Sequence, residues 1–214
     1  MLNRRFIRLI LIGAVGIFLF LLVALFRLSQ LPEPAPDDMQ TSGRQIIRDE
    51  LKRMRESSFG SSTRGTILCD RVETFLEEGR IIFSSKLGGP RGVWHQGIIG
   101  KEKIYVRILE MNNARFLHQL PYQMMEAIFH EAVHSVHGRF HRNSIEEECD
   151  AFVAGMTVET LIKGEAMPKV FMIDGTTLGS YILSAYADLP RNSDYRPIGI
   201  DLKEIYRRAA LVEP

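Results

Sequence analysis

Two histidines four residues apart, with a glutamate directly after the first, are the strongest chemical signal in this chain. The segment His130-Glu131-Ala132-Val133-His134 reads H-E-x-x-H. On a helix, side chains four residues apart lie one above the other, so both imidazoles can reach one ion. Glu131 is turned about 100° away, where its carboxylate can act on water instead of the metal. The spacing therefore predicts a metal site, with Glu131 placed to act on a metal-bound water.

The histidines need a helix with two different faces, and residues 121–137 predict one. Apolar side chains recur along one side of this segment, while His130 and His134 fall on the other. Pro121 suits the first helical turn, and Gly138 suits the end. We expect the helix to bury one side and to present both histidines on the opposite one. The predicted apolar face consists of Met125, Phe129, Ala132, Val133 and Val136.

The third ligand is expected on the following helix. Ser144 and Glu147 have the spacing of an S-x-x-E capping box, which starts a helix at about residue 145 and assigns Glu147 to the cap. Glu146 shares one flank of that helix with Asp150, one turn later. We therefore predict that Glu146 binds the metal and that Asp150 accepts a hydrogen bond from a ligand imidazole.

Three other residues are alternative third ligands. Glu148 lies on the opposite flank from Glu146 and is the main rival. His141 follows from the HExxHxxGxxH pattern, which needs a histidine at 140, where this chain has Phe140 and places His141 one residue late. His137 lies on the same face as the HExxH histidines and is a weaker alternative.

These residues resemble a known family. HExxH at 130–134 followed by E-x-x-x-D at 146–150 is similar to the glutamate-zincin metallopeptidases. The run Glu146 to Phe152 also resembles the E-x-x-A-N/D-x-F-A signature of several bacterial zincins, with Cys149 in the usual alanine place. The resemblance covers about residues 100–157 and is specific for the site, not for a substrate.

The resemblance implies a zinc metallopeptidase that cleaves proteins or peptides. His130, His134 and Glu146 would hold Zn²⁺, and Glu131 would move the proton of the attacking water. Such sites usually add a donor for the tetrahedral oxyanion, and no histidine follows His141 in the sequence. The candidate donors are Tyr181, which we take first, Tyr186 and Tyr195. The strand before the active helix would form the sheet edge that pairs with an extended substrate.

The order of predicted elements favours an α+β fold with its sheet in the first half. Residues 103–110, KIYVRILE, alternate apolar and polar side chains and are the clearest strand. Short strands are also expected at 81–83 and 92–99. We therefore expect a compact zincin-like domain, residues 44–214, with a small sheet and an active-site helix pair. Helices are expected at 44–57, 68–78, 121–137, 145–163, 176–187 and 202–210.

The N-terminal residues predict a membrane anchor. Leu9 to Phe26 contain no charged residue, and a helix of this length spans about 27 Å, close to the hydrocarbon thickness. More basic residues precede this segment than follow it, so the N-terminus is expected in the cytoplasm and the domain beyond the membrane. Residues 1–30 are read as the n-region and transmembrane anchor, and 31–43 as a Pro-rich linker. A cleaved signal peptide is the alternative.

Other features leave alternatives open. The 27 basic and 26 acidic residues nearly balance, so nothing points to nucleic acid. Cys69 and Cys149 would form a disulfide beyond the membrane or remain buried thiols. A peptide deformylase-like hydrolase would use Cys69 as a ligand, although the anchor argues against it. A non-catalytic zincin-fold domain that binds a partner or senses a ligand is the main functional alternative.

Overall fold

The computed structural model describes residues 32–84, 92–95, 101–107, 121–137 and 143–212. The chain divides into two units, 1–33 and 34–214. Within the second unit, the described helices are α2 (Asp37–Glu56), α3 (Thr63–Glu77), α5 (Pro121–His137), α6 (Ile145–Lys163), α7 (Leu178–Ala185) and α8 (Leu202–Ala209). The described strands are β1 (Ile81–Ser84), β2 (Gly92–His95), β3 (Lys103–Arg107), β4 (Met172–Ile173) and β5 (Thr176–Thr177).

The predicted α+β class is wrong, because helices dominate the described part of the chain. The longest described strand, β3, has 5 residues, whereas α2 has 20 and α6 has 19. The strands form one three-stranded and one two-stranded sheet. The alternating pattern of residues 103–110 thus produces the β3 strand. Most of the buried apolar side chains in the described part of the chain, however, belong to the helices.

The three-stranded sheet has the order β1-β3-β2. The β1 and β3 strands are parallel, with Ile81 opposite Ile104, and β2 is antiparallel to β3, with Trp94 opposite the same Ile104. The β3 strand is therefore central, with a neighbour on each side. Our expectation that this strand forms a substrate-binding sheet edge is wrong.

The α2 helix begins inside the segment that we predicted to be a linker. Its first residue is Asp37, directly after Pro36. The residues around this start pack on β1: the Ala35 N–H donates to the Phe83 carbonyl at 2.8 Å, and the Gln40 side chain bonds both the N–H and the carbonyl of Phe83. Prolines before a helix and acidic residues in its first turn are helix-start signals, so the composition of 31–43 fits this structure as well as a spacer.

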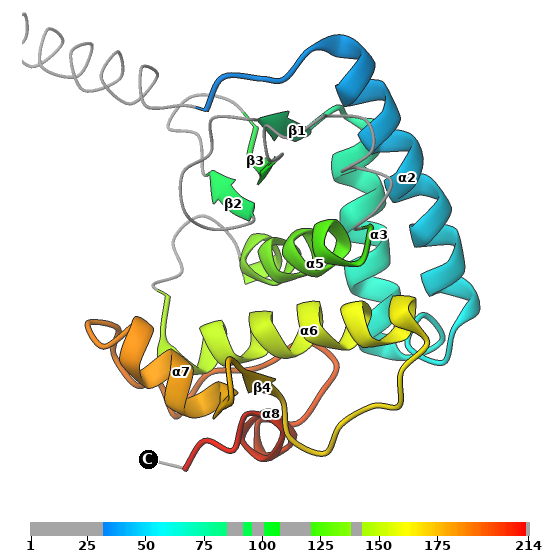
Figure 1. Cartoon of the computed structure of the whole chain (residues 1–214). Helices are drawn as coiled ribbons and strands as arrows, with labels where there is room; N and C mark the ends of the chain where they lie inside the picture. The colour runs from blue at the N-terminus through cyan, green and yellow to red at the C-terminus, as the bar shows by residue number, and fades with distance from the viewer. Residues whose placement is uncertain (1–31, 85–91, 96–100, 108–120, 138–142, 213–214) are drawn as a thin grey trace, which may run out of the picture. The chain divides into compact units, whose positions relative to one another are not determined.

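The α5 helix lies between the sheet and α6, with α2 and α3 along one side (Figure 1). It begins at Pro121 and ends at His137, the predicted bounds. The apolar face that we predicted enters the main core together with side chains of α2, α3, β1 and β3. The opposite face meets α6, which begins at Ile145 and ends at Lys163, again as predicted. These two helices carry the candidate site.

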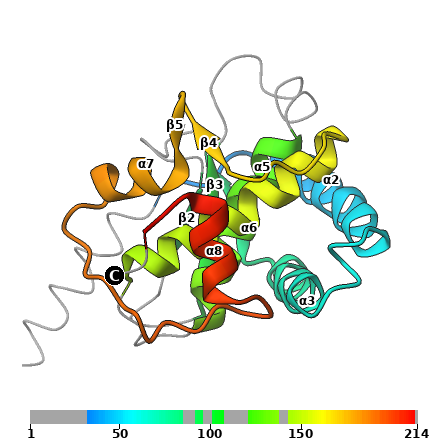
Figure 2. The ribbon, with the colours of Figure 1, turned by 90° about the horizontal axis from the view of Figure 1, so that it is seen from below.

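The α6 helix separates two hydrophobic cores. Ala151, Ala154 and Val158 face the main core. Its other side, with Cys149 and Val153, packs against residues of α7 and α8 in a second core. Viewed from below, α8 crosses α6, and α7 lies beside α6 (Figure 2). A helix with apolar residues on several sides is expected to be buried on several sides.

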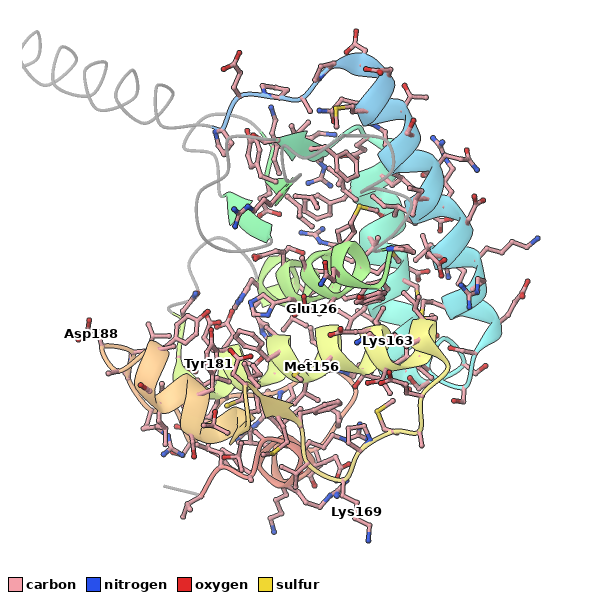
Figure 3. The ribbon with its side chains drawn as sticks, viewed as in Figure 1. Glu126, Met156, Lys163, Lys169, Tyr181 and Asp188 are labelled. Atoms are coloured by element: carbon pink, nitrogen blue, oxygen red, sulfur yellow. The ribbon has the colours of Figure 1, made fainter. Side chains whose placement is uncertain are left out.

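Gly155 allows α5 and α6 to approach closely. A Cβ atom built at this position would lie 2.6 Å from the Glu126 carbonyl oxygen of α5. Figure 3 shows Glu126 on α5 above Met156, the residue after Gly155 on α6. Any larger residue at 155 must push the two helices apart. The glycine therefore sets the separation across which the site residues meet.

The predictions of a transmembrane helix and of a domain beyond the membrane are contradicted. Leu9 to Phe26, the segment that carried them, lies outside the described residues. In the part of the chain that the structure describes, no helix combines the length and apolar character that crossing a membrane requires.

Candidate metal centre

The two histidines of the HExxH segment meet on the face of α5 that points toward α6. Their Nε2 atoms lie 3.3 Å apart, and their ring centroids lie 5.0 Å apart. Two nitrogens that each bind a tetrahedral zinc ion at about 2.0–2.1 Å lie about 3.3 Å from one another. His130 and His134 therefore have the separation that two ligands of one zinc ion require.

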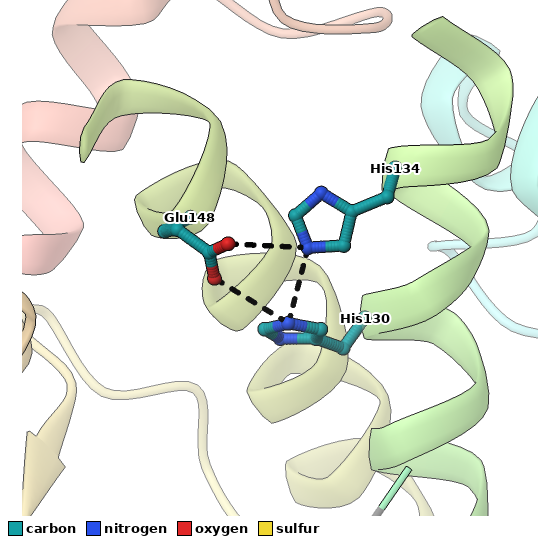
Figure 4. Close-up of side chains that lie close together, drawn as sticks. All are labelled: His130, His134 and Glu148. Carbon is teal, nitrogen blue, oxygen red and sulfur yellow. Dashed lines mark hydrogen bonds and ion pairs between the residues drawn. The ribbon is translucent and has the colours of Figure 1, made fainter. Parts of the chain in front are cut away.

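A carboxylate from α6 completes the group (Figure 4). Glu148 Oε1 lies 3.6 Å from His134 Nε2, and Glu148 Oε2 lies 3.7 Å from His130 Nε2. One ligand atom from each residue falls within 4.8 Å of the others. Two imidazoles and one carboxylate are a common ligand set of catalytic zinc, which keeps a fourth position for water or substrate.

The Glu148 carboxylate itself indicates a missing partner. Its side chain is 5% exposed, and Asn143 donates to Oε1 at 3.2 Å. Oε2 is buried and has no hydrogen-bond partner among the described residues. Burial raises the pKa of Glu148, although the charge of His134 opposes this change. A buried oxygen without a partner costs free energy, and a divalent cation beside the two imidazoles would satisfy it. The residues present fit zinc.

The two imidazoles have different electrostatic surroundings. Burial and the charge of His134 hold the pKa of His130 well below its usual value, so His130 is neutral, as a metal ligand must be. Burial also lowers the pKa of His134, but the hydrogen bond to Glu147 and the charges of Glu148 and Glu131 raise it above the usual value. A dication at the cluster would oppose protonation of both rings.

Glu147 fixes the orientation of His134. Its Oε1 lies 2.9 Å from His134 Nδ1. The N-cap that we predicted is present, because the Ser144 hydroxyl accepts from the Glu147 N–H at 3.2 Å. The Glu147 side chain, which we assigned to the capping box, instead turns toward His134. A neutral His134 that donates its Nδ1 proton to this carboxylate presents the Nε2 lone pair to a metal.

Glu146, which we predicted as the third ligand, lies apart from the histidine pair. Its carboxylate accepts from Arg191 Nε and from the Asn192 N–H, each at 2.6 Å, and from the Tyr206 hydroxyl at 3.4 Å. These donors come from the C-terminal part of the chain. The geometry favours Glu148, our alternative ligand, over Glu146.

Asp150, which we predicted to orient a ligand imidazole, contacts other groups. It forms an ion pair with Arg64 and accepts from the Tyr195 hydroxyl at 2.7 Å. The same hydroxyl lies 2.8 Å from His137 Nε2, so His137 is engaged outside the metal group. Glu147 therefore has the role that we expected of Asp150. No local pattern indicates Arg64 as a partner of Asp150, because the two residues lie 86 positions apart.

The candidate base and the candidate oxyanion donors differ in their burial and in their contacts. Glu131 is 8% exposed, and its charge raises the pKa of both His134 and Tyr186. Tyr195 is only 2% exposed and bonded to Asp150, so it is a poor donor to substrate. Tyr181, our first candidate, packs its ring 5.8 Å from that of Phe152. Burial raises the pKa of Tyr186, and the charges of Glu148, Tyr181 and Glu131 raise it further.

The remaining predicted residues have simple outcomes. His141 falls outside the described residues. Cys69 and Cys149 are free, fully buried thiols in different cores, so the disulfide that we left open does not form.

Comparison of the chain with protein-family models, with curated proteins and with solved structures gave no match.

Proposed function

We propose that this chain is a zinc-dependent peptidase, with His130, His134 and Glu148 as metal ligands and Glu131 as the general base. One observation carries the proposal: a buried Glu148 oxygen that has no hydrogen-bond partner in the described part of the chain lies 3.7 Å from His130 Nε2. Beside it is a second imidazole whose Nδ1 is bonded to another carboxylate. The HExxH resemblance supplies the reaction class.

The chain's own residues would divide the chemistry between them. Zinc bound here would supply a Lewis acid that polarises the scissile carbonyl and acidifies water. Glu131 would take the proton from the attacking water and pass it to the nitrogen of the leaving amine. Glu147 would hold His134 in one orientation throughout.

Tyr186 is our candidate for the oxyanion donor. Burial and the charges of Glu148, Tyr181 and Glu131 raise its pKa, so the phenol keeps its proton at neutral pH and can donate it in a hydrogen bond. A donor at Tyr186 would stabilise the tetrahedral oxyanion by about 2.7–4 kcal/mol if it resembles known oxyanion-hole donors.

The test compares zinc-loaded full-length protein with the Glu131→Gln variant on an unfolded, fluorescently labelled protein substrate. We expect cleavage by the first and a loss of at least about 100-fold in the second, the usual contribution of a general base. Glu131→Gln should still bind one zinc ion, which separates catalysis from folding. Stoichiometric zinc in the wild-type protein without any cleavage would instead favour the binding or sensor alternative.

A further inference from the structure

An aromatic side chain lies directly beside the metal ligands. Phe152 follows Glu148 by one turn of α6, and its ring centroid lies 4.5 Å from that of His130, with the two planes at 83°. This edge-to-face contact places Phe152 next to the imidazole on the more exposed side of the cluster, since the His130 side chain is 12% exposed and that of His134 only 5%. A substrate that reaches the metal from this side would pass Phe152.

Two tyrosines extend this aromatic surface. Tyr181 on α7 and Tyr186 at its C-terminal end have ring centroids 5.8 and 6.2 Å from that of Phe152, both nearly perpendicular to it. Figure 3 shows Tyr181 on the side of α7 that faces α6. All three rings are partly buried against the second core, and each keeps some exposed surface. The three rings and the metal ligands therefore form one continuous region.

The chemistry of this region favours an aromatic ligand group. Aromatic rings prefer edge-to-face neighbours, and Phe152 already pairs in this way with His130 and with both tyrosines. The charges of Glu131 and Glu148 act on Tyr186, so an acidic side chain would be repelled. A bound dication would reduce, without cancelling, the negative charge of the three carboxylates Glu131, Glu147 and Glu148, so a cationic side chain would gain little attraction.

We propose that Phe152, Tyr181 and Tyr186 form a subsite that receives an aromatic side chain of the peptide substrate next to the scissile bond. This inference rests on the proposed peptidase function and adds the class of residue that the enzyme prefers. Phe152 forms the part of the subsite nearest the metal, and the two tyrosines form the part contributed by α7.

The experiment measures binding of metal-directed probes that the protein cannot cleave. Acetohydroxamate and the N-acetyl hydroxamates of Phe, Leu, Ala, Arg and Asp are titrated calorimetrically into zinc-loaded full-length protein. We expect the Phe probe to bind at least about tenfold more tightly than the Ala probe, as edge-to-face contacts and added apolar surface imply. The Asp probe should bind most weakly.

Variants test the residues. Tyr181→Ala should reduce the advantage of the Phe probe over the Ala probe to within about threefold, because the contacts of this ring are lost. Tyr181→Phe keeps the ring and should keep the preference. Tyr122→Ala is the matched control, since this tyrosine packs under Lys163 at the opposite end of the α5–α6 pair.

Each result has a distinct meaning. Equal binding of the Phe, Leu and Ala probes, or tightest binding of the Arg probe, would overturn the aromatic subsite and leave the peptidase proposal standing. Failure of every hydroxamate, acetohydroxamate included, to bind the zinc-loaded protein would overturn both proposals. The probe series on the wild-type protein decides these outcomes even if Tyr181→Ala does not fold.

Discussion

Glu147 Oε1 lies 2.9 Å from His134 Nδ1, and both side chains are at most 5% exposed. This contact joins α6 to α5 through a metal-ligand candidate, and it uses a side chain that the sequence pattern assigned to helix capping. The Ser144 hydroxyl caps α6, and the Glu147 carboxylate contacts the imidazole.

Replacing Glu147 by Gln is therefore expected to weaken zinc binding about 10–100-fold, the usual effect of losing a charged partner of a ligand imidazole. The amide can still accept a hydrogen bond, so folding should be little affected. Competition with a chelating indicator measures the dissociation constant. Glu159→Gln, which removes an ion pair with Lys163 on the same helix, is the control and should bind zinc normally. Equal affinities for the two variants would contradict the role of Glu147.

The third ligand is tested by the pair Glu148→Gln and Glu146→Gln. We expect Glu148→Gln to lose more than about 100-fold in zinc affinity, beyond the effect of an outer partner. Glu146→Gln should keep its zinc and lose about 1–3 kcal/mol of stability, because Arg191 loses its charged acceptor. Elemental analysis after dialysis and chemical denaturation provide the two readouts. Zinc loss in Glu146→Gln alone would restore our original ligand assignment.

The sequence predicted the helix pair but could not predict which flank of α6 faces α5. Periodicity places Glu146 and Glu148 on opposite sides of one helix. It does not show which of these sides packs against the neighbouring helix. The α6 helix has apolar residues toward both cores, so its pattern does not identify the side of the histidines. We chose Glu146 because Asp150 follows it by one turn. In the structure that flank binds Arg191, Arg64 and Tyr195 instead.

The fold class was missed for a related reason. Each predicted strand is present where the structure describes it, but the strands are short. The α2 and α3 helices are longer than predicted, because the sequence pattern did not identify their first residues. Pro36 and Asp37 read as a linker, and Thr63 begins α3 five residues before the helix that we predicted. Local signals of this kind identify the type of element better than its extent.

Asp150→Asn should destabilise the fold without removing the metal. Its ion-pair partner Arg64 is only 6% exposed, so the variant leaves a buried guanidinium without a counter-charge. Such losses cost about 3–5 kcal/mol, more than we expect for Glu146→Gln, whose partner Arg191 is 33% exposed. Urea denaturation of metal-free protein measures the difference. A zinc-binding defect with unchanged stability would instead give Asp150 the orienting role that we first predicted.

The two cysteines should react slowly in the native protein. Burial raises the pKa of the Cys69 thiol to about 11, and that of Cys149 to about 12, so almost no thiolate is present at pH 8. We expect a colourimetric thiol reagent to detect close to no thiol in native protein within minutes and both thiols after unfolding in guanidinium without reductant. Absence of free thiols in the unfolded, unreduced protein would reveal a disulfide and contradict the structure.

Gly155→Ala tests whether close helix contact positions the site. At an open helical position this change stabilises a protein by up to about 1 kcal/mol, because alanine has the higher helix propensity. Here the added Cβ would lie 2.6 Å from the Glu126 carbonyl oxygen, so α6 must move away from α5. Overpacking of this kind costs about 1–3 kcal/mol, which outweighs the propensity gain. We therefore expect a net loss of stability in metal-free protein and weaker zinc binding, since the shift separates Glu148 from the histidines.

Glu159→Ala on the same helix, which adds no atom to the α5 contact, should bind zinc like the wild type. A stabilised Gly155→Ala variant with normal zinc affinity would show that the two helices do not pack as closely as the structure places them.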